Sequence, residues 1–71
     1  MAEMGKDFSP VDVLHLAIQR EKDAHTFYVE MAARFAADPG AKAMFATMAE
    51  EELKHQRKLE AWLEEHFQRE N

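Results

Sequence analysis

The positions of proline and glycine constrain the fold of this chain more than any other feature, because these two residues break helices most strongly. After Gly5 the only prolines and glycines in the sequence are Pro10 and the pair Pro39-Gly40. They divide the 71 residues into two long stretches that have no helix-breaking residue inside them. The sequence therefore predicts two long helices joined by a tight turn, in one domain.

Each stretch begins with residues typical of a helix N-terminus. Ser9 precedes Pro10, and Asp38 precedes Pro39, so a capping side chain is followed by proline at the first helical position in both cases. Asp12 adds a negative charge near the positive end of the first helix dipole. Both helices are therefore expected to start at a defined residue.

The predicted fold is all-α. We place helices over about residues 10–36 and 39–68, each about 40–45 Å long at 1.5 Å per residue. Residues 1–8 are expected to be a flexible N-terminal segment, and residues 9–71 one antiparallel helical hairpin. A core this small rarely supplies more than about 3–5 kcal/mol by itself. The chain has no cysteine, so oligomerisation or a metal held by Glu and His is left to stabilise it.

Apolar residues recur at helical spacing along one side of each predicted helix. The first stripe comprises Leu14, Ala17, Ile18, Ala24, His25, Tyr28, Ala32 and Phe35. The second comprises Ala41, Met44, Phe45, Met48, Ala49, Leu59, Trp62 and Leu63. One hairpin cannot cover both stripes, so we expect two copies to pack these faces together as a homodimer, in a four-helix bundle.

Three polar side chains interrupt the stripes, Glu21 in the first and Glu52 and His55 in the second. A buried carboxylate costs several kcal/mol unless a partner or a metal compensates it. Glu52 and His55 are three residues apart and share a helix face, as in the Glu-x-x-His unit of di-metal helical bundles. All three lie at a similar distance from the turn near residue 38, so an antiparallel hairpin brings them together.

Two copies would bring four glutamates and two histidines to the bundle centre, where two divalent cations would balance the four carboxylates. Without metal, the carboxylates would repel one another and some would bind protons. These ligands suit iron, and manganese or zinc would also fit. The alternative is an ordinary polar network of salt-bridged or solvated side chains. His25, one turn after Glu21, fits an interior or dimer contact better than a ligand or proton relay, and whether it joins the site stays open.

At these residues the sequence resembles the rubrerythrin branch of the ferritin-like superfamily. The matching stretches are Ala17-Ile-Gln-Arg-Glu-Lys-Asp-Ala-His-Thr-Phe-Tyr28 and Met48-Ala-Glu-Glu-Glu-Leu-Lys-His55. The resemblance covers about residues 14–66. It implies a ferritin-like bundle in which Glu21, Glu52 and His55 are iron ligands and Tyr28 donates a hydrogen bond to them.

The common form of that family has four helices and two ligand sets in one chain, and this chain carries half of them. The half-length form is similar to the encapsulated ferritins, in which two-helix chains dimerise to build a ferroxidase site. Those chains typically have Trp six residues after the first Glu, where this chain has Phe27. The chain also lacks a tail resembling a shell-targeting peptide and the Cys₄ iron domain that supplies electrons in many rubrerythrins, so a shell and an electron donor are open as partners.

We therefore expect a non-haem di-iron oxidoreductase, with two irons per dimer, that oxidises Fe²⁺ with O₂ or peroxide. A peroxide reductase with an external electron donor is the nearest alternative, and a metal-free helical dimerisation or adaptor module is the alternative from another class. A net charge of −5 argues against nucleic acid as a partner. No apolar run is long enough to span a bilayer, and residues 1–7 lack the apolar segment of a signal peptide, so neither is expected. A cytoplasmic protein, free or inside a protein compartment, is expected.

Overall fold

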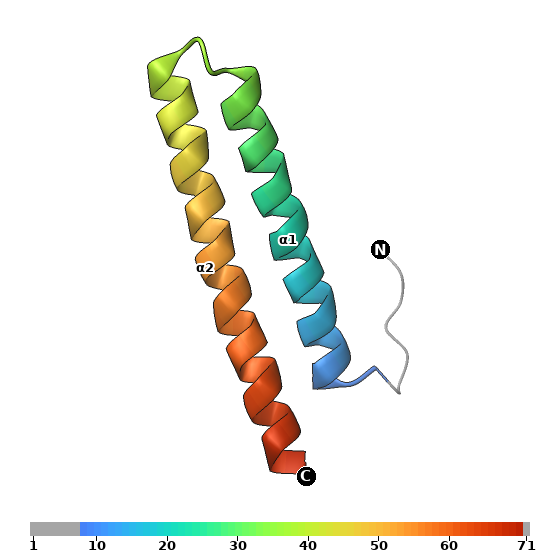
Figure 1. Cartoon of the computed structure of the whole chain (residues 1–71). Helices are drawn as coiled ribbons and strands as arrows, with labels where there is room; N and C mark the ends of the chain where they lie inside the picture. The colour runs from blue at the N-terminus through green and yellow to red at the C-terminus, as the bar shows by residue number, and fades with distance from the viewer. Residues whose placement is uncertain (1–7, 71) are drawn as a thin grey trace.

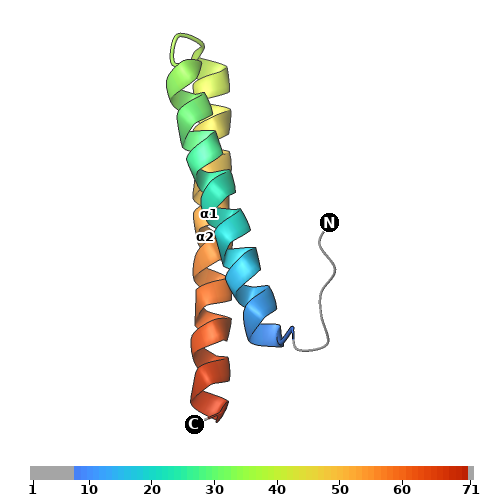
Figure 2. The same cartoon turned by 90° about the vertical axis from the view of Figure 1, so that its right-hand side faces the viewer.

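The chain forms a hairpin of two antiparallel helices (Figure 1). The computed structural model describes the backbone of residues 8–70 and the side chains of residues 8–66. Helix α1 spans Pro10–Arg34 and helix α2 spans Pro39–Glu70. The helices lie side by side in Figure 1, and in Figure 2, where α1 is in front of α2, they diverge towards the open end at which α1 begins. The all-α hairpin predicted from the sequence is thus confirmed, and residues 1–7 of the predicted N-terminal segment lie outside the described residues.

Both helices begin at the predicted capping residues. The Asp12 backbone N–H donates to Ser9 Oγ at 3.2 Å, and the Ser9 N–H donates to Asp12 Oδ2 at 2.9 Å, so each residue caps the other. The hydrogen bonds that the Ser9 backbone N–H and, at 3.1 Å, the Ser9 hydroxyl donate to the Asp12 carboxylate lower the pKa of Asp12. At the start of α2, Asp38 Oδ1 accepts a hydrogen bond from the Ala41 N–H at 3.1 Å. The caps fix the residue at which each helix begins.

The predicted helix ends were each wrong by two residues. Helix α1 stops at Arg34, and α2 continues to Glu70. After Arg34 the chain must reverse direction, and proline disfavours a helical conformation in the residue before it, so the turn starts earlier than the apolar pattern suggests. The Asp38 N–H donates to the Phe35 carbonyl at 2.9 Å and closes this turn.

The hairpin has almost no core of its own. Its principal dimensions are 49 × 28 × 11 Å. The smallest of these, 11 Å, is the thickness of a single layer of helices. Among the described residues only Ile18 and Ala49 are buried hydrophobic side chains, at 7% and 5% exposure. The large hydrophobic residues that stay exposed are Val13, Leu16, Phe27, Val29, Phe35, Met44 and Trp62. The contact between the helices thus covers only part of the two apolar stripes.

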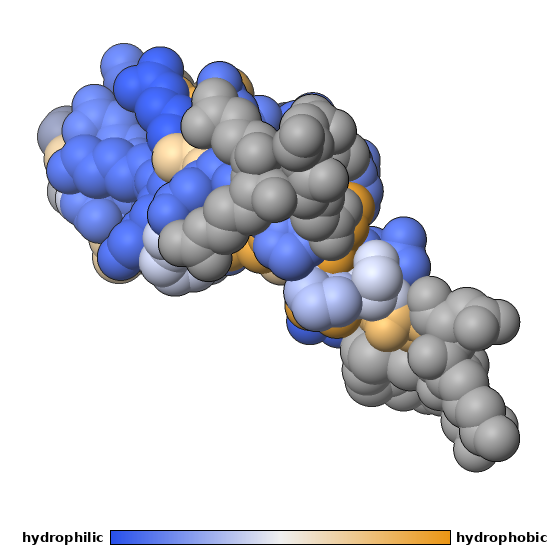
Figure 3. Space-filling model, turned by 90° about the horizontal axis from the view of Figure 1, so that it is seen from below, coloured by the Kyte–Doolittle hydropathy of each residue, from blue (hydrophilic) through white to orange (hydrophobic). Residues whose placement is uncertain are grey.

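The surface at the open end of the hairpin is mainly polar. Seen from the open end of the hairpin, the described residues are mostly hydrophilic, with small hydrophobic areas between them (Figure 3). Within the described residues, neither helix has the length and apolar character needed to cross a membrane.

Candidate metal centre

The three predicted ligands meet at the middle of the helix–helix contact. Glu21 is near the centre of α1, and Glu52 and His55 are near the centre of α2. His55 Nδ1 lies 3.6 Å from Glu21 Oε2 and 3.7 Å from Glu52 Oε2. One donor atom from each side chain lies within 4.8 Å of the other two. The sequence predicted that these three side chains meet because they lie at a similar distance from the turn. This is confirmed, since two segments thirty residues apart converge on one point.

The separations suit a bound cation better than direct bonds among the three side chains. At 3.6 and 3.7 Å, the His55 contacts are longer than the 2.7–3.2 Å of protein hydrogen bonds. Nitrogen and oxygen ligands bind a cation such as zinc at about 2.0–2.2 Å, so adjacent ligands are separated by about 3–4 Å. The three donors could therefore reach one ion through small side-chain movements.

The burial of the centre is uneven. The Glu21 and Glu52 side chains are 24% and 21% exposed, whereas the His55 side chain is 55% exposed. Glu21 Oε2 is buried and has no hydrogen-bond partner among the described residues. A buried oxygen without a partner is costly, and a cation would compensate it. The open side of the centre is thus the side on which His55 lies.

Electrostatics within one chain are unfavourable at this point. A hydrogen bond with the neighbouring Glu52 carboxyl, which can form when one of the two groups is protonated, raises the pKa of Glu21. Partial burial and the charge of Glu52 act in the same direction, and His55 opposes them. A carboxylate that is held back from ionising by another carboxylate is stabilised when a cation replaces the proton. The donor set therefore fits a divalent metal.

Tyr28 lies in an aromatic cluster on the turn side of the centre. Its ring stacks on Phe45 with centroids 6.5 Å apart and meets Phe27 edge-on at 5.4 Å. Phe45 also contacts Phe35 at 5.9 Å. Among residues 8–66 the Tyr28 hydroxyl has no hydrogen bond, so a single hairpin does not contain the predicted bond to a ligand. The role of Tyr28 therefore stays a prediction that depends on a second copy.

His25 does not join the three ligands. It is half-buried on α1, and its Nδ1 atom is buried without a hydrogen-bond partner among the described residues. The part of the chain with described side chains contains no other group of three potential metal-binding side chains. Sequence reasoning therefore missed no potential metal-binding group among these residues. In the single chain, His25 is not part of the predicted metal centre.

Comparison with known proteins agrees with this arrangement. The family model for rubrerythrin matches residues 12–71, which include all but the first two residues of the two helices and all three predicted ligands. No curated protein and no solved structure matches the chain significantly.

Proposed function

The chain belongs to the rubrerythrin family, and from that premise we propose that it is a non-haem di-iron protein that oxidises Fe²⁺ with O₂ or peroxide. Two copies complete the site, each supplying Glu21, Glu52 and His55. Iron bound there would supply redox chemistry that amino-acid side chains do not have. The oxidation of two Fe²⁺ ions releases two electrons. With two protons, these reduce one O₂ to H₂O₂ or one H₂O₂ to two water molecules.

The convergence of the three donor atoms within 4.8 Å carries this proposal. A polar network of the ordinary kind would bring a Lys or Arg to these carboxylates. Among the residues with described side chains, the ion pairs of Glu21 and Glu52 involve only His55, which is neutral unless protonated. Three weakly paired donors at the centre of a helical contact are better explained by a bound cation.

The side chains have distinct roles in the proposed reaction. Glu21 and Glu52 bind the cations and balance their charge, since a dimer contributes four carboxylates for two divalent ions. His55 supplies a neutral ligand and leaves positions open for the oxidant. Tyr28 donates a hydrogen bond to a ligand carboxylate of the assembled site and so tunes its basicity. The surrounding apolar residues exclude bulk water.

Metal analysis of protein purified without added metal tests the proposal most directly. We expect about one metal per chain, and consumption of O₂ or peroxide when either oxidant is added to protein that was loaded with Fe²⁺ under anaerobic conditions. Glu50→Gln is a suitable control, because Glu50 is an exposed glutamate on the same helix. This variant should keep both the metal and the activity.

Two results would assign another function. Peroxide removal that requires an added reductant and ignores free Fe²⁺ would show a peroxide reductase with an external donor. A dimer that holds no metal and shows no change in thermal stability at saturating Fe²⁺ or Zn²⁺ would show a metal-free helical module.

A further inference from the structure

Two buried polar atoms of the hairpin have no hydrogen-bond partner, and both belong to side chains on consecutive turns of α1. They are Glu21 Oε2 and His25 Nδ1. Among the buried and half-buried residues with described side chains, no other side-chain nitrogen or oxygen is in this state. Buried polar atoms are nearly always hydrogen-bonded in folded proteins, so this pair needs an explanation.

The two atoms are chemically complementary. A neutral imidazole carries its proton on one of its two ring nitrogens, so His25 Nδ1 can be a donor. An ionised carboxylate only accepts hydrogen bonds, and each of its oxygens has two lone pairs. Glu21 Oε2 can therefore bind a cation through one lone pair and accept a hydrogen bond through the other. A donor and an acceptor that both lack a partner would satisfy each other.

Helix geometry places the two side chains within reach of each other. Residues four apart are neighbours on a helix surface, with Cβ atoms about 5–6 Å apart. Long and aromatic side chains lean towards the helix N-terminus, which directs the His25 ring back over the turn that contains Glu21. In the single hairpin Glu21 Oε2 lies 3.6 Å from His55 Nδ1 and makes no hydrogen bond to His25. Rotation of the two side chains is enough to join them.

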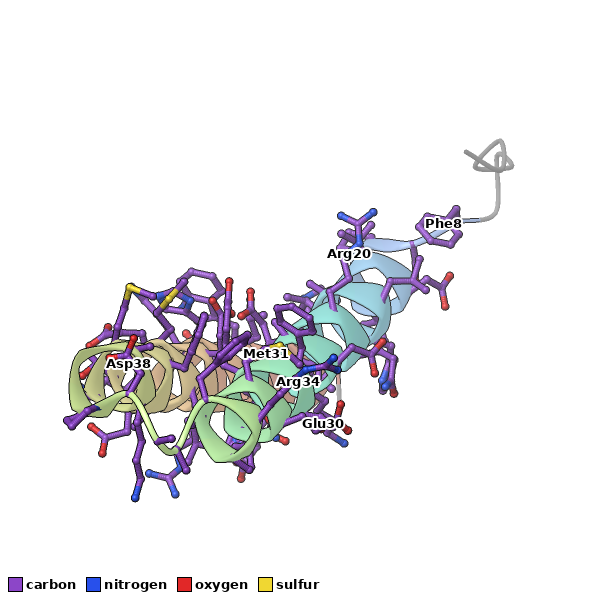
Figure 4. All side chains as sticks on the ribbon, turned by 90° about the horizontal axis from the view of Figure 1, so that it is seen from above. Phe8, Arg20, Glu30, Met31, Arg34 and Asp38 are labelled. Atoms are coloured by element: carbon purple, nitrogen blue, oxygen red, sulfur yellow. The ribbon has the colours of Figure 1, made fainter. Side chains whose placement is uncertain are left out.

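His25 faces the neighbouring helix and not the exposed apolar side of α1. Arg20 and Glu30 each lie five residues from it, about 140° round the helix, and both project outward from α1 in the view from the turn (Figure 4). His25 is half-buried and lies only about 20° round the helix from the buried Ile18. A second copy that covered exposed residues such as Phe27 would therefore leave His25 in place.

We propose that His25 is a positioning residue of the metal centre, whose Nδ1–H donates a hydrogen bond to Glu21 Oε2 and holds this carboxylate towards the bound cation. The inference rests on the proposed metal centre and adds to it a residue that binds no metal. Carboxylates that bind metals are themselves hydrogen-bonded, which fixes their orientation. The second ring nitrogen, Nε2, is not one of the buried atoms without a partner, and it can accept a hydrogen bond while the proton stays on Nδ1.

His25→Leu tests the hydrogen bond, with Zn²⁺ as the probe because zinc has no redox chemistry. Without metal, the variant removes a buried atom that lacks a partner, so its Tm should be higher than that of the natural protein. Its affinity for Zn²⁺, measured by competition with a chelator, should be about 10–100-fold lower. His15→Leu is the matched control, because His15 is an exposed histidine on the same helix, and it should bind Zn²⁺ as the natural protein does.

Two further readouts separate a hydrogen bond from simple packing. His25→Asn keeps an N–H donor near the position of Nδ1 and should keep most of the Zn²⁺ affinity. Nitrogen-15 NMR of the Zn²⁺-loaded natural protein should show the neutral His25 ring protonated at Nδ1.

Three results would overturn the role of His25 and leave the metal centre intact. They are equal Zn²⁺ affinities of the natural protein and His25→Leu, an asparagine variant as weak as the leucine variant, and a neutral ring protonated at Nε2. A natural protein that binds no Zn²⁺ would overturn the metal centre itself.

Discussion

Replacing Glu21 by glutamine should stabilise the metal-free protein and abolish its stabilisation by metal. The donor atoms of Glu21 and Glu52 lie within 4.8 Å of each other. At that separation two charges repel by about 1 kcal/mol in water and about 3.5 kcal/mol at an effective dielectric constant of 20. The two side chains remain partly exposed, at 24% and 21%, so water screens their repulsion and places it near the lower value. Because glutamine is neutral and nearly isosteric, we expect the free energy of unfolding to rise by about 1 kcal/mol per chain at pH 7.

Thermal melts with and without metal measure both effects. A gain of about 1 kcal/mol raises the Tm of a domain of this size by about 4–8 °C. Metal at a hundred times its Kd should add about 2.7 kcal/mol to the natural protein and little to the variant, so the order of the two melting temperatures should reverse. Glu50→Gln should follow the natural protein in both states. An unchanged or lower Tm of metal-free Glu21→Gln would refute the electrostatic reasoning.

The same pair predicts how stability depends on pH. The pKa of Glu21 is raised in the folded chain above its ordinary value of 4.5, so proton binding favours the folded state. This contribution is fully present below pH 4.5 and is lost as the pH rises through the folded pKa. The advantage of metal-free Glu21→Gln should therefore shrink on acidification from pH 7 towards pH 5. A constant difference across that range would contradict the prediction.

Three further variants test separate parts of the proposal. Glu52→Ala should lose most of the bound metal and most Fe²⁺ oxidation, and unchanged metal content would remove Glu52 from the ligand set. Tyr28→Phe should keep the metal and slow turnover by about 10-fold, the lower end of the range for a residue that supports a ligand, and turnover at the natural rate would leave Tyr28 with a packing role only. Leu16→Asp should shift the protein towards monomer in sedimentation, because it introduces a charge among the exposed hydrophobic residues of α1, and a dimer as stable as the natural one would place the interface elsewhere.

The hairpin could be predicted from the sequence because its strongest signals are local. Ser9 and Asp38 cap helices next to prolines, and these short-range hydrogen bonds form as predicted. The ends of the helices were less certain, since neither Arg34 nor Phe35 carries a strong stop signal. Helix α1 ends where the chain must begin the turn, and the position of the turn depends on the path of both helices.

The cluster of predicted ligands could be predicted because each residue of a helix adds a fixed rise, so the number of residues from the turn gives the position along the helix. Glu21, Glu52 and His55 needed only the position of the turn to be brought together. The surroundings of Tyr28 could not be obtained in this way. Its stacking on Phe45 depends on side-chain rotamers and on the rotation of the two helices about their axes, which the spacing of residues in the sequence does not determine.

The thinness of the hairpin links the amount of this protein in a cell to its survival there. A layer 11 Å thick with two buried hydrophobic side chains among its described residues gives a lone chain little resistance to unfolding or to proteases. Association and metal binding, as proposed above, would stabilise the folded state by mass action. Newly made chains would therefore persist only once enough of them had accumulated to find one another, and sooner when iron is plentiful. Degradation of unassembled chains would then match the amount of protein to the supply of metal without a dedicated sensor.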